Sequence, residues 1–215
     1  MSSLRKQMVG YIGATGLRAS RSLLTGLILC LAINVAASPS PHESVRLATD
    51  ELIEKLLVTR PLYETDPEKF YSEIDESLAP FIDFEGFSKG VMAKYYRRAN
   101  DDQKIRFTTS FRESLITTYA KALVGFDNQE IVVKESSIPQ KVPNKARVEL
   151  EVHGKDGAIY PVEYSLVLID NQWKLRNLVI NGINMGLQFR SQFSNYMQQY
   201  KNDIDEVINH WKVDG

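Results

Sequence analysis

The chain has 215 residues, of which 43% are apolar and 25% charged, a composition typical of one globular domain or at most two small ones. With 26 basic residues against 27 acidic ones it is not a basic protein, which argues against nucleic acid as its main partner. A single cysteine excludes an internal disulfide framework.

The first 37 residues differ from the rest of the chain, because all their charges are positive and they end in an apolar run. This run, Leu23–Ala37, is too short for a membrane span, which needs roughly 20 residues. A basic start, a short apolar stretch and small residues at its end are typical of a secretory signal peptide. We therefore predict a signal peptide over residues 1–37, cleaved before Ser38, with an uncleaved N-terminal anchor as the alternative.

Removal of this segment changes the charge and the thiol content of the mature chain. It takes away four basic residues and Cys30, which leaves 22 basic residues against 27 acidic ones and no cysteine. The resulting net charge of −5 argues against nucleic acid and against steady electrostatic adhesion to anionic membranes. We expect an exported, soluble protein that folds without disulfides.

The N-terminal part of the mature chain is predicted to be helical. Residues 38–42 are expected to form a short Pro/Ser linker, and residues 43–61 place apolar side chains at helical spacing. A second helix is predicted from Pro67 to Pro80, with Asp66 as its N-cap. The apolar stripes of these two helices consist of Val45, Ala48, Leu52 and Leu56, and of Phe70, Ile74 and Leu78.

A long helix is predicted after residues 82–99, which are expected to hold one or two short helices. Asn100 is the expected N-cap of the long helix and Gly125 its expected end. Its apolar residues recur at strict four-residue spacing and are Phe107, Phe111, Leu115, Tyr119 and Leu123.

The period of the pattern then changes from helix to strand. Residues 145–153 alternate between apolar and polar side chains, which predicts a strand with one buried and one solvated face. Residues 160–168 and 173–179 give two further strands, and residues 131–133 an edge strand. Helix is expected again after Gly182.

Helices first, strands second and helices last predict an α+β fold in a single domain over residues 43–215. We expect a small antiparallel sheet of about four strands, wrapped by the N- and C-terminal helices.

Motifs that carry chemistry are missing from the sequence. The three histidines His42, His153 and His210 are widely separated, and Asp101 and Asp102 open a helix, where the helix dipole favours acids. No nucleophile elbow, dinucleotide fingerprint or phosphate loop occurs. We therefore expect no catalytic activity, no metal site and no cofactor.

Two aromatic rows would face each other if the long helices cover one face of the sheet. They consist of Phe107, Phe111 and Tyr119, and of Tyr164, Trp173, Phe189 and Phe193. Facing rows indicate either an ordinary packed core or a dry cavity that accepts an apolar guest. A strand of five or six residues is roughly 17–20 Å long, and the hydrocarbon of one bilayer leaflet is roughly 15 Å thick. A single acyl chain could therefore lie along the strand direction in such a cavity. Periodicity leaves both interpretations open.

Two segments of the chain resemble one protein family. The first is GVMAKYYRRANDDQKIRFTTSFRESLITTYAKAL, residues 90–123, with a glycine turn, an aromatic–arginine pair, an acidic helix cap and an F-x-x-x-F helix that ends in T-Y-A-x-x-L. The second is VEYSLVLIDNQWKLRNLVINGINMGLQFRSQF, residues 162–193, with a tryptophan strand, a glycine corner and an arginine-containing helix. Together with the export signal, they resemble the toluene-tolerance, or MlaC-like, periplasmic phospholipid-binding proteins over residues 43–211.

The resemblance implies a periplasmic carrier that holds the acyl chains of a glycerophospholipid in an apolar pocket between sheet and helices. Its implied partners are an inner-membrane ABC transporter with a substrate-binding ring and an outer-membrane lipoprotein–porin complex, and its implied role is to maintain the lipid asymmetry of the outer membrane. We expect a monomer without a cofactor. The alternatives are a binding module or chaperone for another apolar ligand, and a lipid hydrolase.

The facing rows and the resemblance together give the candidate tail-binding residues, for each of which core packing is the alternative. These residues are Phe107, Phe111, Tyr119, Leu123, Val148, Leu150, Val162, Tyr164, Leu166, Trp173 and Val179, with Ile183, Met185 and Leu187 as the lip of the pocket at the strand-to-helix corner. Methionine suits such a lip because its side chain adapts to irregular apolar surfaces.

Three arginines are candidates for polar contacts. Arg190 follows the corner by one helical turn and is expected to pair either with a lipid phosphate or with an internal acid. Arg97 and Arg98, which follow two tyrosines, are expected to serve docking or headgroup contact.

Overall fold

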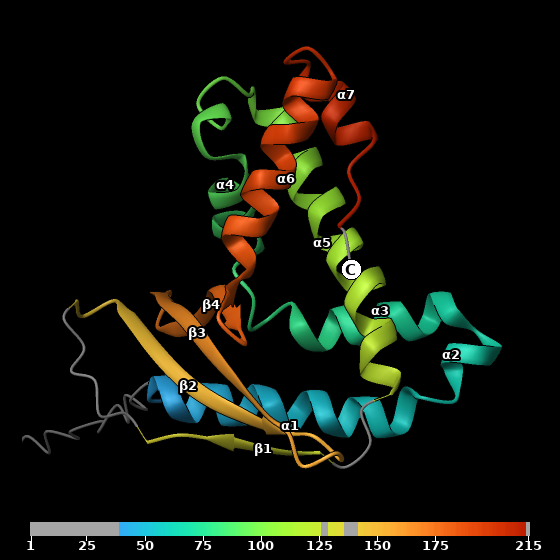
Figure 1. Cartoon of the computed structure of the whole chain (residues 1–215), viewed down its shortest axis with the longest axis vertical. Helices are drawn as coiled ribbons and strands as arrows, with labels where there is room; N and C mark the ends of the chain where they lie inside the picture. The colour runs from blue at the N-terminus through green and yellow to red at the C-terminus, as the bar shows by residue number, and fades with distance from the viewer. Residues whose placement is uncertain (1–38, 126–128, 136–141, 214–215) are drawn as a thin grey trace, which may run out of the picture. The chain divides into compact units, whose positions relative to one another are not determined.

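The computed structural model describes residues 39–125, 129–135 and 142–213 (Figure 1). The predicted signal peptide, residues 1–37, lies outside the described residues. The elements are, in chain order, α1 (Pro41–Thr59), α2 (Leu62–Thr65), α3 (Pro67–Leu78), α4 (Phe84–Met92), η1 (Ala93–Tyr95), α5 (Asp101–Val124), β1 (Glu130–Val133), β2 (Lys145–His153), β3 (Ile159–Ile169), β4 (Gln172–Ile180), β5 (Ile183–Asn184), α6 (Met185–Gln199) and α7 (Ile204–Asn209). The predicted α+β class is confirmed.

Polar caps determine where the main helices begin. Asn100 caps α5 as predicted: its Oδ1 accepts a hydrogen bond from the Gln103 N–H at 2.8 Å, and the Gln103 side chain accepts one from the Asn100 N–H at 3.0 Å. Gly125 follows the last residue of this helix, also as predicted. By contrast, α1 starts inside the predicted linker, because Ser40 caps it and Pro41 suits its first position.

The sheet is an antiparallel meander in the order β1-β2-β3-β4-β5, with one strand more than the four expected. The additional strand, β5, pairs with the end of β4 through a two-residue turn at Asn181 and Gly182. Both turn residues have positive φ, 48° and 80°, as the favoured two-residue hairpin turn requires. The sequence predicted a strand-to-helix corner at Gly182. The structure instead has a β-hairpin of β4 and β5 here, and β5 leads directly into α6.

A β-bulge in β4 shifts the phase of its side chains. The register against β3 steps from Asn177 to Leu175, so that Arg176 is an extra residue without a partner on β3. Beyond the bulge Leu178 lies opposite Tyr164, while Val179 lies opposite Glu163 on the other face. The prediction that Val179 belongs to the inward row is therefore wrong, because strict alternation does not survive an inserted residue.

Helix α1 covers part of the inner face of the sheet (Figure 1). Its fully buried Val45 packs into one core cluster with Val148 and Leu150 of β2. The outer face of the sheet is polar and carries the ion pair between Arg147 and Glu163, whose atoms lie 3.6 Å apart. This arrangement confirms the half-buried strand that the alternation in residues 145–153 predicted.

A second core joins the helices α4, α5, α6 and α7. The ring of Phe193 lies 4.8 Å from that of Phe107, and the rings of Phe111 and Phe189 lie 5.6 Å apart. Thus the helical aromatic residues pack against each other, while Tyr164 and Trp173 belong to the sheet. The predicted rows therefore face each other in part: Phe107 and Phe111 contact Phe193 and Phe189, whereas Trp173 lies in the core cluster under α1. A third core joins α1, α3 and α5 through Leu56, Phe70, Ile74, Ile116 and Ala120.

Acidic conditions are expected to weaken the contact between α5 and α7. Asp205 accepts hydrogen bonds from Arg106 and Gln103, and the bond from Arg106 lowers the pKa of this carboxyl below its ordinary value of 3.8. A lowered pKa in the folded state contributes stability above pH of about 4, which is lost as the pH falls further. Urea unfolding between pH 5 and 3 should therefore show a steeper loss of stability in the parent protein than in Asp205→Asn. Equal slopes would contradict this role of the carboxylate.

Candidate functional site

An apolar cavity of about 300 Å³ lies between the helices α3 and α5 and the strands β3 and β4. Its volume is at the lower end of the range of small-molecule sites, about 300–1,000 Å³. It is lined by Ile74, Leu78, Ile82, Phe84, Phe87, Leu115, Ile116, Tyr119, Ala120, Ala122, Leu123, Tyr164, Leu175, Leu178, Ile180, Met185 and Phe189.

The β-bulge determines which residues of β4 reach the cavity. Leu175 precedes the extra residue Arg176, whereas Leu178 and Ile180 follow it. The side chains of all three residues nevertheless line the cavity. Opposite them, Tyr164 of β3 pairs with Leu178 across the ladder. The inserted residue therefore brings apolar side chains from both halves of the strand to one wall.

The connection between α3 and α4 forms another wall and is attached to the sheet. The backbone N–H of Asp83 donates to the carbonyl of Leu175 at 2.9 Å. The Asp83 side chain accepts a hydrogen bond from Nε of Arg176 at 2.6 Å. Ile82 and Phe84 line the cavity, whereas the Asp83 carboxylate is engaged elsewhere, because it caps α4 by accepting from the Gly86 N–H at 2.9 Å and also accepts from Arg176.

The lining carries no charge, and its only polar side-chain groups are the hydroxyls of Tyr119 and Tyr164. Burial raises the pKa of Tyr164, so this phenol stays neutral at physiological pH. Such a space favours an apolar guest over water and offers no nucleophile or acid–base pair.

The described part of the chain holds neither a cluster of metal ligands nor a helix that could span a membrane. Within residues 39–125, 129–135 and 142–213, no group of three or more histidine, cysteine, aspartate or glutamate side chains could hold a metal ion. Among the helices of these residues, none combines the length and the apolar character needed to cross a membrane.

Four of the residues predicted for lipid-tail contact line the cavity. They are Tyr119 and Leu123 on α5, Tyr164 on β3 and Met185 at the start of α6. The structure thus brings together residues that lie up to 66 positions apart in the sequence. Their contact with a lipid stays a prediction.

The other predicted tail-binding residues lie outside the cavity. Phe107 and Phe111 are fully buried in the helical core. Five residues of the strands belong to the core cluster under α1 or pack against it, and these are Val148, Leu150, Val162, Leu166 and Trp173. For all of these the structure gives the core packing that the sequence left as the alternative, and the bulge turns Val179 to the opposite face.

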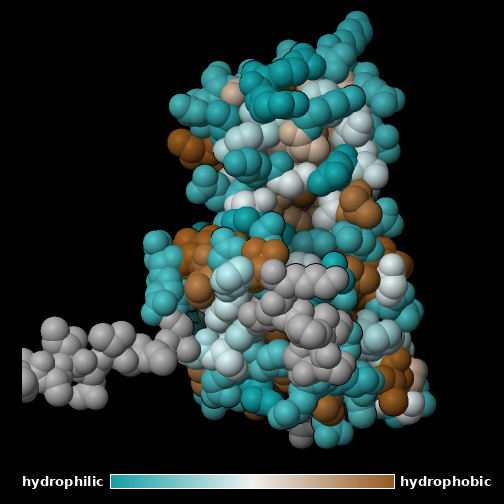
Figure 2. Space-filling model, turned by 90° about the vertical axis from the view of Figure 1, so that its left-hand side faces the viewer, coloured by the Kyte–Doolittle hydropathy of each residue, from teal (hydrophilic) through white to brown (hydrophobic). Residues whose placement is uncertain are grey.

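The predicted lip consists of one inward and two outward residues. Met185 lines the cavity, whereas Ile183 and Leu187 are 52% and 53% exposed. Large apolar side chains with such exposure beside an apolar cavity are candidates for contact with an apolar partner. On the face in Figure 2, hydrophobic side chains gather around mid-height, whereas the upper part is mostly hydrophilic.

None of the three predicted arginines lines the cavity. Arg190 donates from Nε to the carbonyl oxygen of Gly90 at 3.1 Å, and no carboxylate of the described residues forms an ion pair with it. Of the two predicted partners of Arg190, an internal acid is thus not found among the described residues, and contact with a lipid phosphate stays a prediction. Arg98 stacks over the ring of Tyr95 at 5.9 Å, and Arg97 is exposed.

Sequence reasoning missed most of the cavity lining on α3, α4 and the neighbouring connection. A signal existed for α3, since Ile74 and Leu78 belong to its predicted apolar stripe. Phe84, Phe87 and Ile116 had no such signal, because their direction depends on how α4 and α5 cross.

Comparisons with known proteins point to one family. A family model described as MlaC protein matches residues 46–213. The toluene tolerance protein ttg2D of Pseudomonas putida is 38% identical over 88% of this chain and 89% of its own length. The intermembrane phospholipid transport system binding protein MlaC of Haemophilus influenzae is 22% identical over 69% of this chain and 71% of its own.

A solved structure shares the fold. A phospholipid-binding protein from Ralstonia solanacearum, in complex with a phospholipid, superposes with a TM-score of 0.72 at 20% identity and covers 80% of this chain and 94% of its own. This likeness confirms the fold.

Proposed function

Because the chain belongs to the MlaC family, we propose that it is a phospholipid carrier that holds acyl chains in the apolar cavity. The observation that carries the proposal is the lining, whose seventeen side chains are apolar except for two tyrosine hydroxyls. Further support comes from the Ralstonia solanacearum protein of the same fold, which is described with a bound phospholipid.

The physics of burial indicates how such a carrier would load and unload. Each buried methylene contributes about 0.8 kcal/mol, so two acyl chains correspond to a transfer free energy on the order of 20 kcal/mol. Spontaneous release into water is then negligibly slow, whereas transfer from one apolar site to another costs little. Handover therefore takes place in direct contact with a donor or an acceptor, and its direction comes from these partners.

The proposed location is the periplasm, and the proposed partners are membrane complexes on either side of it. One is an inner-membrane ABC transporter with a substrate-binding ring, and the other an outer-membrane lipoprotein–porin complex. The name of the Haemophilus influenzae relative, a binding protein of an intermembrane phospholipid transport system, supports this arrangement. In this role the carrier maintains the lipid asymmetry of the outer membrane.

The residues proposed to contact the lipid tails are the predicted residues that line the cavity, together with the lining residues that were not predicted from the sequence. Tyr119 and Leu123 of α5 supply one wall, and Tyr164, Leu178 and Ile180 of the sheet supply another. Met185 lies where the cavity meets the exposed pair Ile183 and Leu187, and we assign these three residues to the lip through which tails pass.

Catalysis is not part of the proposed function, because the cavity lining holds no histidine, carboxylate, serine or cysteine. A lipid hydrolase would need such a group beside the bound ester. Incubation of the purified protein with phospholipid should therefore release no lysophospholipid or fatty acid. Turnover that scales with protein concentration would contradict this part of the proposal.

The test of the carrier function is to identify the ligand. The mature protein is purified from the periplasm of a Gram-negative host and extracted with organic solvent, and the extract is analysed by mass spectrometry. We expect glycerophospholipid in a defined ratio to protein. Absence of phospholipid, or a different apolar molecule in stoichiometric amount, would overturn the proposal in favour of a module or chaperone for another ligand.

A further inference from the structure

The phenol hydroxyl of Tyr164 is a hydrogen-bond donor inside the apolar cavity. Tyr164 of β3 lines the cavity, and the centroid of its ring lies 6.2 Å from that of Phe81. Burial is the cause that raises the pKa of this tyrosine, so its hydroxyl is shielded from water. Among residues 39–125, 129–135 and 142–213, none forms a hydrogen bond with this hydroxyl. A donor is thus held in an apolar space without a partner.

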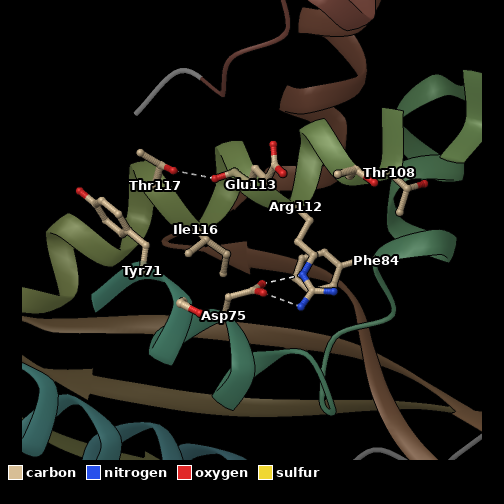
Figure 3. Close-up of a pocket in the computed structure, with 10 residues that line it drawn as sticks. Tyr71, Asp75, Phe84, Thr108, Arg112, Glu113, Ile116 and Thr117 are labelled. Carbon is tan, nitrogen blue, oxygen red and sulfur yellow. Dashed lines mark hydrogen bonds and ion pairs between the residues drawn. The ribbon is translucent and has the colours of Figure 1, made fainter. Parts of the chain in front are cut away.

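The polar groups next to the cavity satisfy each other and leave this hydroxyl without an acceptor. In a polar pocket of about 410 Å³ between α3 and α5, Arg112 donates to the two carboxylate oxygens of Asp75 at 2.6 and 2.5 Å, and Figure 3 shows the two side chains pointing toward each other. The buried side chains of Phe84 and Ile116 line both pockets and separate this ion pair from the apolar cavity. Because a buried donor without a partner is unfavourable and rare in proteins, the Tyr164 hydroxyl points to an acceptor on a bound ligand.

Tyr164 lies one row of the sheet inside the lip. In the ladder between β3 and β4, Val162 pairs with Ile180 and Tyr164 pairs with Leu178. Ile180 also pairs with Ile183 of β5, which belongs to the lip. Two residues along a strand span about 7 Å, so the backbone of Tyr164 lies about this far inside the lip. A phospholipid with its tails in the cavity and its headgroup outside the lip has its two acyl ester groups in this zone.

An ester carbonyl is the acceptor that such a lipid offers just below its headgroup. The carbonyl is neutral, so its burial requires a hydrogen-bond donor but no charge, which suits a cavity lined by neutral groups. A phosphate would instead bring an unpaired negative charge into this space. We propose that the Tyr164 hydroxyl donates a hydrogen bond to an acyl ester carbonyl of the bound phospholipid, an assignment that rests on the proposed function. This hydrogen bond fixes how deeply the tails enter the cavity.

The hydrogen bond makes Tyr164 a residue that selects ester-linked over ether-linked lipids. A diether analogue has the same headgroup and the same chains but no carbonyl, so it leaves the Tyr164 hydroxyl unpaired. Sites that hydrogen-bond a polar group of their ligand discriminate against an analogue that lacks this group. The empty protein carries the same unpaired hydroxyl, and loading with an ester lipid therefore relieves an unfavourable burial.

The test is a competition between two lipids that differ only in their linkage. Delipidated protein is loaded from vesicles that contain equal amounts of phosphatidylethanolamine and of its diether analogue with the same chain lengths. Mass spectrometry of the extracted protein gives the ratio of the two lipids retained. The variants are Tyr164→Phe, which removes only the hydroxyl, and Tyr160→Phe as the matched control. Tyr160 lies on the same strand, but it is 40% exposed and does not line the cavity.

We expect the parent to retain about tenfold more ester lipid than ether lipid, because one hydrogen bond to a buried donor distinguishes the two. The preference should disappear in Tyr164→Phe and persist in Tyr160→Phe. The infrared carbonyl stretch of the bound ester should lie at a lower frequency in the parent than in Tyr164→Phe, because a hydrogen bond weakens the C=O bond. Without lipid, Tyr164→Phe should be at least as stable toward urea as the parent, since it lacks the unpaired hydroxyl.

Three results would overturn the assignment and leave the carrier function intact. Equal retention of the two lipids by the parent would show that the cavity does not recognise the carbonyl, and this measurement requires no variant. An unchanged preference in Tyr164→Phe would assign the recognition to another group. Lower stability of the empty Tyr164→Phe protein, with equal losses of both lipids, would make the hydroxyl a structural group. A parent protein that retains neither lipid would instead refute the proposed function itself.

Discussion

Replacing Met185 with glutamate is expected to empty the apolar cavity of phospholipid while the fold stays intact. Met185 lines the cavity and is the first residue of α6, which Asn184 caps. A carboxylate in this position would face acyl chains, and an unpaired charge in an apolar environment is strongly unfavourable. We expect at least about a tenfold decrease in bound phospholipid per protein, measured by extraction and mass spectrometry.

The same substitution should be harmless to the helix, because an acid in the first turn interacts favourably with the helix dipole. Gln188→Glu is the control: it adds a negative charge near the same helix start, but Gln188 is exposed and belongs neither to the cavity lining nor to the lip. Circular dichroism and the urea midpoint should be close to the parent values in both variants.

Equal phospholipid content in Met185→Glu and the parent would remove the corner from the tail-binding site. A loss as large in Gln188→Glu as in Met185→Glu would indicate that surface charge near the corner, and with it loading at a partner or membrane, governs lipid content.

Replacing Phe107 with alanine is expected to have the largest effect on stability. Phe107 is fully buried and its ring contacts those of Phe111, Phe193 and Trp211 at centroid distances of 4.8 to 5.9 Å. Removal of a buried phenylalanine ring costs about 3–5 kcal/mol, as lost burial and as a cavity that the helices do not refill. Urea unfolding should show this decrease in the free energy of unfolding.

This variant also distinguishes core packing from tail contact at Phe107. Because Phe107 lies in the helical core, phospholipid bound per folded molecule should equal that of the parent. Ile105→Ala on the same helix is the control: Ile105 is 67% exposed, so its free energy of unfolding should change by no more than about 0.5 kcal/mol. A selective loss of phospholipid at unchanged stability in Phe107→Ala would return this residue to the binding site.

Local signals in the sequence were sufficient for most of the secondary structure. The alternation in residues 145–153 coincides with β2, and the capping box at Asn100 and Gln103 marks the start of α5. These features depend on neighbours within a few residues, so they can be read along the chain. The dipeptide Asn181–Gly182 is a known signature of a hairpin turn. The strand that follows it has only two residues, which is too short to show the alternation of apolar and polar side chains by which a strand is predicted.

The candidate site was much less predictable. Val179 and Leu178 exchanged their expected faces because Arg176 is inserted as a bulge, and the sequence alone does not show where a ladder skips a residue. The ion pair between Arg112 of α5 and Asp75 of α3 likewise gave no signal, since the two residues lie 37 positions apart on different helices.

By itself, the sequence determined that this chain has an α+β fold with apolar stripes on long helices and an amphipathic sheet, and that it resembles phospholipid-binding proteins. Periodicity identifies which side chains avoid water, because it records the face of each element. Only the tertiary structure decided which of these side chains fill a core, as Phe107 does, and which enclose a cavity, as Tyr164 and Met185 do. The reason is physical: a packed core and a cavity lining require the same apolar residues and differ only in the distance between the layers that carry them.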